Sequence, residues 1–329
     1  MIKGGLMTVW MSIGLGLALL VIGGEVLVRG ASMAARKLGV SPLLIGLTLV
    51  GFGTSTPELV TSVQAALAGS PGIAVGSVVG SNISNALLIL GLTALIAPIA
   101  VDRRAFLRDG PMLALVTAAA VWVFLQGQLT RQFGLIAVGL LAAYIFLVWL
   151  LERKHPDAEG ERVEDGADLK SGWHGSPWIA LLLAVAGIAV TIVGAGFLVD
   201  GSVSLARSYG VSDTIVGLTI VAVGTSMPEL VTSVIAALRK QGDVALGNII
   251  GSNLYNLLGI LGITAIIKPV AVPPELLGVD VWVLAAATGA MILFAFRGMK
   301  IFRLEGLALV AGFGGYMAWL LWTAGAFGK

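Results

Sequence analysis

The hexapeptide Gly53-Thr54-Ser55-Thr56-Pro57-Glu58 lies inside an apolar stretch, and it recurs in a second apolar stretch as Gly224-Thr225-Ser226-Met227-Pro228-Glu229. The two glutamates are 171 positions apart (229 − 58). At the same spacing, Gly80-Ser81-Asn82 with Asn85 recurs as Gly251-Ser252-Asn253 with Asn256. Apart from Thr56, which corresponds to Met227, each polar residue of these motifs therefore has an identical counterpart in the second copy.

The likeness extends well beyond these motifs. Residues 39–101 align with residues 210–272 without a gap, and 36 of the 63 positions are identical. A weaker correspondence continues outward, for example between Asp109 and Asp280. A repeat of this length indicates that one half of the chain is a duplicate of the other.

The composition is that of a membrane protein. Of the 329 residues, 57% are hydrophobic and only 12% are charged, and the mean hydropathy is +0.99. Soluble domains carry about 25% charged residues, so a soluble globular fold is excluded. Cysteine is absent, which excludes disulfides and thiolate metal sites. The net charge of +2 gives no reason to expect a nucleic-acid partner.

The apolar runs predict an all-α integral membrane protein with ten transmembrane helices. Five helices in each half is an odd number, so the second half enters the membrane upside down relative to the first. We expect an N-terminal five-helix repeat (1–152), a linker (153–175) and an inverted C-terminal repeat (176–329), with helices 2, 3, 7 and 8 broken. The ten spans are expected near 7–35, 41–68, 72–99, 108–126, 132–151, 177–207, 212–238, 243–267, 277–296 and 304–325.

The distribution of Lys and Arg predicts the orientation. Of the 20 basic residues, 14 fall on the side of the connections that follow odd-numbered spans, five fall on the other side, and Arg29 lies near the end of the first span. Cytoplasmic loops attract positive charge. We therefore expect both termini outside and the polar segment 152–175 in the cytoplasm, in an inner or plasma membrane. That segment reads as a solvated linker, since it lacks the ligand pattern of a calcium loop.

Proline interrupts one helix in each copy. Pro57 and Pro228 have no amide hydrogen to donate to the carbonyl groups of Gly53 and Gly224. We expect carbonyl groups near 51–54 and 222–225 to be freed at membrane depth, which is tolerable where they line a cavity.

The polar residues beside these breaks are typical ligands of hard cations. Thr54 and Glu58 share a helix face, as do Ser81 and Asn85, because each pair is four residues apart. The two copies together offer carboxylate, hydroxyl, amide and carbonyl oxygens without histidine or cysteine. Such a set suits calcium, sodium or magnesium, and a flexible cage of many protein oxygens favours calcium.

Other interpretations of these residues are weaker. An ion pair is not expected for the two glutamates, since no basic residue falls in the middle of a predicted span. Asn82 and Asn253 are as well explained by helix capping as by ion binding. A channel is disfavoured by the inverted repeat, and an enzyme with a serine nucleophile would lack a base, because the spans hold no histidine or lysine.

Two buried carboxylates repel each other, so an empty site attracts either protons or cations. An exchanger follows if several ions compete for the same pair of acids and only charge-compensated states cross the membrane.

At these motifs the chain resembles the cation/calcium exchanger superfamily, and within it the prokaryotic sodium/calcium exchangers. The resemblance covers nearly the whole chain and rests on the doubled G-T-S-x-P-E and G-S-N-x-x-N motifs. It implies exchange of sodium for calcium by alternating access, with the first and sixth helices sliding against the other eight. The transported ions and the lipid bilayer are the partners that it implies; no cofactor and no obligate protein partner are expected.

The resemblance also implies a set of ion ligands. Calcium would lie between Glu58 and Glu229 with the carbonyl groups of Thr54 and Thr225, and Asn85 and Asn256 would complete the centre. The two implied sodium sites are Ser55, Ser81, Glu58 and the Gly51 carbonyl on one side, and Ser226, Ser252, Glu229 and the Ala222 carbonyl on the other.

One position departs from the pattern. Several relatives, including potassium-dependent exchangers, carry aspartate where this chain has Asn256. The centre then holds one fewer potential negative charge, which argues against potassium transport and leaves proton/calcium exchange as the alternative.

Overall fold

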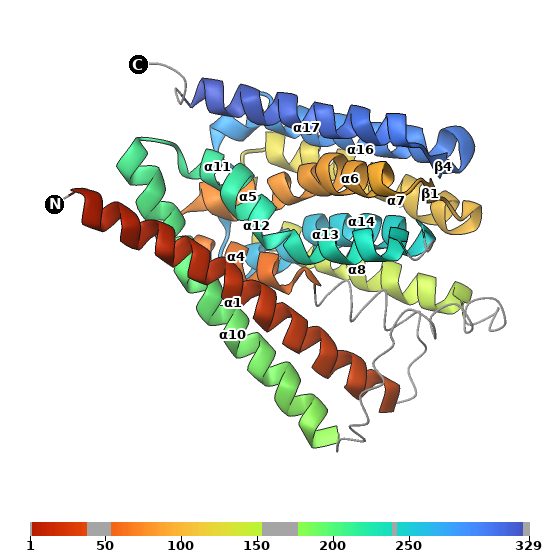
Figure 1. The fold of residues 1–329 in the computed structure, drawn as a ribbon, viewed down its shortest axis with the longest axis horizontal. Coiled ribbons are helices and arrows are strands. Elements are labelled where there is room, and N and C mark those ends of the chain that lie inside the picture. The colour runs from red at the N-terminus through yellow and green to blue at the C-terminus, as the bar shows by residue number, and fades with distance from the viewer. Residues whose placement is uncertain (1, 38–53, 153–176, 239–241, 325–329) are drawn as a thin grey trace.

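The computed structural model describes residues 2–37, 54–152, 177–238 and 242–324. Two long helices, α1 (Ile2–Lys37) and α10 (Pro177–Tyr209), lie side by side and cross the packed set of remaining helices at an angle (Figure 1). The predicted linker 153–175 and Gly51 lie outside the described residues.

The remaining elements form two series in the same order. The first comprises α4 (Thr56–Leu67), α5 (Pro71–Ile83), the π-helix η2 (Ser84–Ile89), α6 (Leu90–Ile96), β1 (Ile99–Ala100), α7 (Arg103–Leu125), β2 (Gln128–Leu129) and α8 (Arg131–Glu152). The second comprises α11 (Asp213–Val216), the π-helix η3 (Gly217–Val221), α12 (Ala222–Thr225), α13 (Met227–Leu238), α14 (Gly242–Leu254), the π-helix η4 (Tyr255–Ile260), α15 (Leu261–Ile267), β3 (Val270–Ala271), the short 3₁₀ helix η5 (Pro274–Leu277), α16 (Asp280–Gly298), β4 (Lys300–Ile301) and α17 (Arg303–Thr323).

The described residues contain seven helical runs that are long and apolar enough to cross a membrane, or eight if the bent pair Asp213–Thr225 and Met227–Leu238 is one span. Large apolar side chains cover the outside of these helices, with Leu304 79% and Trp178 75% exposed. Apolar surface of this extent is typical of contact with lipid. The chain is a multi-pass, all-helical membrane protein.

Of the four predicted breaks, the one in helix 7 is confirmed and those in helices 3 and 8 are wrong. The break in helix 2 stays a prediction, because residues 38–53 lie outside the described residues. The second-copy helix bends by 45° between α12 and α13, next to Pro228. The runs α5–η2–α6 and α14–η4–α15 are continuous, however, because each passes through a π-helical turn instead of breaking. In a π-helical turn each amide bonds one residue further back than in an α-helix. The two turns begin two residues after the Gly-Ser-Asn motifs and include Asn85 and Asn256.

Those two continuous runs form the interior of the molecule. In the most apolar part of Pro71–Ile96, 94% of the residues are buried, and in that of Ala245–Ile267 the share is 83%. In each of the other unbroken spans, fewer than half of the corresponding residues are buried. Glycine lets neighbours approach them closely. A Cβ on Gly91 would lie 2.9 Å from the Gly306 carbonyl oxygen, and one on Gly134 would lie 2.5 Å from the Gly262 carbonyl oxygen. α17 thus packs on α6 as α8 packs on α15.

Two short antiparallel strand pairs mark opposite ends of the bundle. β1 pairs with β4, and β2 pairs with β3. α7 connects β1 directly to β2, so the two pairs lie at its two ends, and Figure 1 shows β1 and β4 together at one of them. We call these the β1–β4 end and the β2–β3 end.

α1 and α10 approach each other closely through glycine. A Cβ on Gly16 would lie 2.6 Å from the Leu198 amide nitrogen, and one on Gly23 would lie 2.7 Å from the amide nitrogen of Thr191. Small residues at a helix crossing let two backbones meet, which stabilises helix pairs in membranes by van der Waals contact.

Candidate functional site

The two glutamates lie at the starts of two helices in the centre of the bundle. Glu58 is in the first turn of α4 and Glu229 is in the first turn of α13, and each is 1% exposed. Pro57 and Pro228 each occupy the second position of the new helix, where a missing amide hydrogen costs nothing. The positive end of a helix dipole therefore points at each carboxylate.

The residue before each helix has the same unusual backbone. Ser55 has φ −89° and ψ 6°, and Ser226 has φ −84° and ψ 9°. This bridge region is sparsely populated and is common at functional residues. It turns the chain so that each serine hydroxyl lies at the helix start.

Each hydroxyl reaches across to the other copy. Ser55 Oγ donates to Glu229 Oε1 at 3.0 Å, and Ser226 Oγ donates to Glu58 Oε1 at 3.0 Å. The resemblance groups each serine with the glutamate of its own copy as sodium ligands, and that grouping stays a prediction, whereas the hydrogen bonds join each serine to the glutamate of the other copy. The helix starts face each other, so the serine of one copy lies beside the carboxylate of the other.

The second oxygen of each carboxylate has no hydrogen-bond partner among the described residues. Glu58 Oε2 and Glu229 Oε2 are both buried in this state, and so are Ser252 Oγ and both amide atoms of Asn256. Buried polar atoms are nearly always hydrogen-bonded in proteins, and each one left alone costs about 1–3 kcal/mol. A concentration of such atoms around two carboxylates is typical of a site that binds a cation.

The serine and threonine residues of the two copies have unequal contacts. Ser81 Oγ donates to the Ala222 carbonyl oxygen at 3.3 Å, which connects α5 to α12. The Ala222 carbonyl also accepts from the Ser226 amide at 3.2 Å, so it is not freed as predicted. Thr225 Oγ1 donates to the Val221 carbonyl oxygen at 2.9 Å, while Thr54 is 4% exposed.

The asparagines also differ between the copies. Asn85 Nδ2 donates to Asn253 Oδ1 at 2.9 Å and so connects the two central helix runs. Asn82, the counterpart of Asn253, instead donates to the Val78 carbonyl oxygen of its own helix at 2.8 Å. Asn253 thus contacts the other copy through Asn85, whereas Asn82 does not cross between the copies.

The structure brings together most of the predicted ligand residues. Ser55 is hydrogen-bonded to Glu229, and Ser226 to Glu58. Ser81 donates to the Ala222 carbonyl oxygen. In the part of the chain that the structure describes, no three His, Cys, Asp or Glu side chains are gathered. The charge of the site thus comes from two carboxylates, and its other oxygens are neutral.

Comparison with known proteins agrees with this geometry. The sequence model of the family described as "Sodium/calcium exchanger protein" matches residues 8–150 and 179–322. The chain belongs to the sodium/calcium exchanger family. It is a member of the cation/calcium exchanger superfamily of the prokaryotic type.

Several relatives match over nearly their whole length. The putative antiporter CaxA of Alkalimonas amylolytica is 40% identical over 307 residues, covering 92% of this chain and 95% of that protein. The sodium/calcium exchanger MaX1 of Methanosarcina acetivorans is 33% identical over 331 residues, covering 90% and 93%. A solved structure of the sodium-calcium exchanger NCX_Mj, soaked with Na⁺ and Sr²⁺, is 31% identical with a TM-score of 0.65, covering 95% and 98%.

Proposed function

We propose that this protein is a secondary antiporter that exchanges Na⁺ for Ca²⁺ by alternating access. The crossed Ser55–Glu229 and Ser226–Glu58 hydrogen bonds carry the proposal, because they hold two buried carboxylates in one site. The family and the name of the relative MaX1 support the same substrates. The activity is transport rather than catalysis.

The two carboxylates make the ions compete. A single Ca²⁺ compensates both negative charges, and two Na⁺ ions or two protons do the same. Two ionised carboxylates without a bound cation in a poorly solvated site cost several kcal/mol. The protein without bound ions therefore seldom changes between its outward-facing and inward-facing conformations. Exchange follows, since one ion must be replaced by another before the site reorients.

The proposed ligands are those that the resemblance implies, with the serines exchanged between copies. Calcium would contact Glu58 and Glu229 with the Thr54 and Thr225 carbonyl groups. One sodium site would combine Glu58 with Ser226 and Ser81, and the other would combine Glu229 with Ser55 and Ser252. The proposed set also includes Asn85, Asn256, the Ala222 carbonyl and the Gly51 carbonyl.

The proposed architecture is ten helices in two inverted repeats, 1–152 and 176–329, joined by a cytoplasmic linker. Two contacts support the inversion. The end of α4 lies beside β3, since Ala66 and Val270 line one cavity, whereas the start of α14 lies against β1 at Gly242. α4 and α13 thus run from the site to opposite ends. The excess of basic residues supports a cytoplasmic β1–β4 end, with both termini outside.

Alternating access would come from α1 and α10 moving together past the remaining helices. Their close approach at Gly16 and Gly23 supports movement as one unit, because glycine contacts between the two backbones hold them together.

Proton/calcium exchange is the second candidate. Asparagine at position 256 leaves only Glu58 and Glu229 as carboxylates of the motif, and two acids are sufficient to carry two protons.

The deciding experiment is calcium uptake into proteoliposomes loaded with sodium, with potassium-loaded liposomes and a pH gradient as controls. Uptake that requires internal sodium is expected. Uptake that follows the pH gradient and ignores sodium would support the proton-coupled alternative, and uptake without any counter-ion would indicate a channel.

A further inference from the structure

Asn82 and Asn253, which end the two Gly-Ser-Asn motifs, each lie inside a continuous helical run. Asn82 is in α5, which continues through η2 into α6, and Asn253 is in α14, which continues through η4 into α15. The two side chains are 1% and 0% exposed. Helix capping therefore does not explain them, and a buried amide group needs hydrogen-bond partners for its oxygen and for its nitrogen.

Asn253 holds an asparagine of the other copy. Asn85 Nδ2 donates to Asn253 Oδ1 at 2.9 Å, while Asn85 Oδ1 is buried without a partner among the described residues. An asparagine binds a cation through its oxygen only, because its nitrogen carries two donor hydrogens. The bond to Asn253 thus fixes which side of the Asn85 amide carries the nitrogen and leaves the oxygen free for an ion.

The mirror-image bond is not formed in this state. It would join Asn256 Nδ2 to Asn82 Oδ1, since these residues are the counterparts of Asn85 and Asn253. Both atoms are buried, and neither has a partner in the described part of the chain. The elements that carry them, η4 and α5, are nevertheless packed against each other, as η2 and α14 are. A matching donor and acceptor are therefore present and unused.

The bond that Asn82 makes within its own helix accounts for this difference. Asn82 Nδ2 donates to the Val78 carbonyl oxygen at 2.8 Å, which is a common bond of an asparagine to the preceding turn. Asn253 Nδ2 has no partner among the described residues, so Asn253 makes no such bond. One asparagine is bonded to its own helix and the other crosses between the copies. Their motifs are identical, so each can adopt either arrangement.

The asparagines that are held lie next to the carboxylates. η2, which contains Asn85, packs against α13, and the first turn of α13 contains Glu229. η4, which contains Asn256, packs against α4, and the first turn of α4 contains Glu58. A residue that orients either amide therefore acts on a ligand of the proposed calcium site.

We propose that Asn253 and Asn82 are positioning residues that act in alternation on the calcium ligands. In the present state Asn253 holds Asn85 with its oxygen free for the ion. When the site opens to the other face, Asn253 bonds to the Ile249 carbonyl of its own helix, and Asn82 accepts from Asn256 instead. The inference rests on the proposed calcium site. Groups that orient a metal ligand typically change metal affinity by about 10–100-fold.

The test measures calcium dependence separately at the β1–β4 face and the β2–β3 face, the membrane sides at the two ends of the bundle. Calcium flux is recorded in right-side-out and inverted membrane vesicles while the Ca²⁺ concentration at the accessible face is varied. Asn253→Leu removes the acceptor at similar size, and we expect it to raise the half-saturating Ca²⁺ concentration about tenfold at one face only. Asn82→Leu is expected to do so at the opposite face only.

A double-mutant cycle shows whether the effect passes through the ligand. In an Asn85→Ala background, Asn253→Leu should change the half-saturating Ca²⁺ concentration by less than about twofold, because no amide is left to orient. Asn82→Leu should keep its effect in that background, since it acts on Asn256. A merely structural role of Asn253 would weaken calcium binding equally with and without the Asn85 amide.

Two further variants control for folding. Asn248→Leu removes an asparagine of the same helix, α14, whose Nδ2 donates to Ser233 Oγ at 3.2 Å, and it should change the half-saturating Ca²⁺ concentration at neither face. Asn253→Ala removes the acceptor without adding apolar bulk, and it replaces Asn253→Leu with the same expected result if the leucine variant does not fold. Melting temperatures in detergent report folding.

The outcomes separate this inference from the proposed function. A parent protein that transports no calcium in either vesicle orientation would refute the calcium site itself, and the inference with it. A parent protein that transports calcium, with Asn253→Leu altering both faces equally or neither, would refute the alternation alone.

Discussion

The two copies of the motif are alike in their carboxylates and unlike in their surroundings. Glu58 and Glu229 have the same burial and receive mirror-image hydrogen bonds of 3.0 Å from the serine of the other copy. In contrast, Asn253 accepts from Asn85, while its counterpart Asn82 bonds to its own helix. These asparagines are identical in sequence position and motif, so the difference arises from conformation. The structure is one asymmetric state of a nearly symmetric sequence.

A second difference between the copies is an amino-acid difference beside a buried Tyr–Asp pair. Tyr144 donates to Asp109 at 2.6 Å, and Tyr316 donates to Asp280 at 2.7 Å, so each copy has a buried Tyr–Asp pair. Arg108 also pairs with Asp109 at 2.6 Å, but Val279 stands at the corresponding place before Asp280. Asymmetry of this kind persists in every conformation.

The largest effect is expected when either carboxylate is neutralised, and it tests whether the two glutamates are functionally equivalent. Glu58→Gln and Glu229→Gln should each reduce exchange at least about 100-fold, because either loss removes charge from a buried two-acid site. Calcium flux in proteoliposomes measures the effect, and a thermal unfolding curve in detergent confirms folding. Full activity in either variant would break the equivalence of the two copies.

The crossed hydrogen bonds come next. Ser55→Ala and Ser226→Ala should each weaken exchange about tenfold, since hydrogen bonds to charged groups contribute about 1.5–3 kcal/mol. Ser84→Ala is the matched control, because Ser84 is buried nearby and its hydroxyl has no partner among the described residues. The two variants could raise the half-saturating Na⁺ concentration at different faces. That result would sharpen the comparison, because it would assign one sodium site to each face.

The contact between α1 and α10 predicts a stability effect. Gly16→Val and Gly23→Val should each lower stability by about 1–3 kcal/mol, because the added side chain meets backbone atoms within 2.7 Å. Gly14→Val should have little effect, since nothing lies within 4 Å of a Cβ at that position. Melting temperatures in detergent measure the difference. A stable Gly16→Val protein would mean that the two helices do not stay in contact.

Neutralising the aspartate of each Tyr–Asp pair should lower the free energy of unfolding by different amounts. Asp109→Asn removes the partner of Arg108 and should cost about 1 kcal/mol, a modest value because the Arg108 side chain is 19% exposed. Asp280→Asn keeps an oxygen that accepts from Tyr316 and should cost less. Equal losses in unfolding experiments would show that the arginine contributes nothing to the difference.

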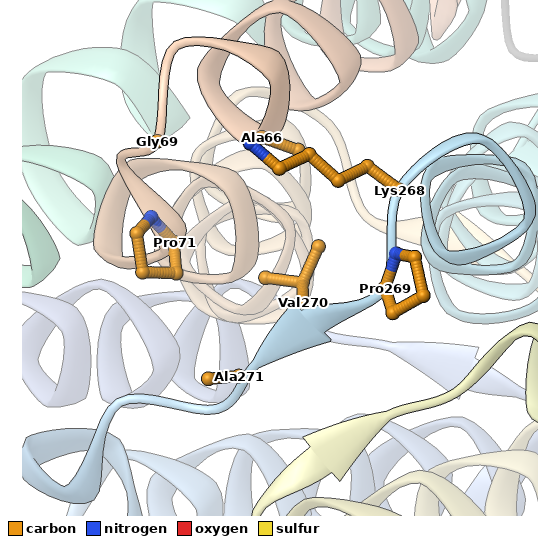
Figure 2. Close-up of a pocket in the computed structure, with 7 residues that line it drawn as sticks. All are labelled: Ala66, Gly69, Pro71, Lys268, Pro269, Val270 and Ala271. Atoms are coloured by element: carbon orange, nitrogen blue, oxygen red, sulfur yellow. The ribbon is translucent and has the colours of Figure 1, made fainter.

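The smallest effect concerns Lys268. Its ammonium nitrogen lies 3.4 Å from the Leu67 carbonyl oxygen at the cavity of Figure 2, and Ala97 is its counterpart in the other copy. Lys268→Gln should lower the half-saturating Na⁺ concentration at the β2–β3 face by less than about twofold at low ionic strength, because exposed charges act weakly. An increase at that face would mean that Lys268 assists entry rather than opposing it.

Much of the site was predictable because the ligand residues are close in sequence and duplicated. The proline beside each glutamate already predicted two carboxylates next to an interrupted helix in the membrane, and the structure adds that each lies in the first turn of a new helix. The crossing of Ser55 to Glu229 was not predictable from spacing, because it depends on how two segments 171 residues apart face each other. The π-helical turns at Ser84 and Tyr255 were also missed, since the residues there suit an α-helix equally well.

The hydrogen-bonded group of Ser62, Thr264 and the Ala74 carbonyl shows the same limit. Ser62, Ser77 and Thr264 are small polar residues in apolar helices, and each alone suggests helix packing. Only the structure shows that their hydrogen bonds connect α4, α5 and α15. Sequence provides the residues on one helix face, whereas contacts between helices depend on packing.

The sequence alone determined that this protein is a duplicated membrane protein with paired buried acids, because composition, proline and glutamate act locally and their spacing is visible along the chain. The tertiary structure decided which hydroxyl accompanies which carboxylate and which asparagine crosses between the copies. Those contacts join residues far apart in the chain, so their geometry is set by the packing of whole helices and by the conformation in which the two copies meet.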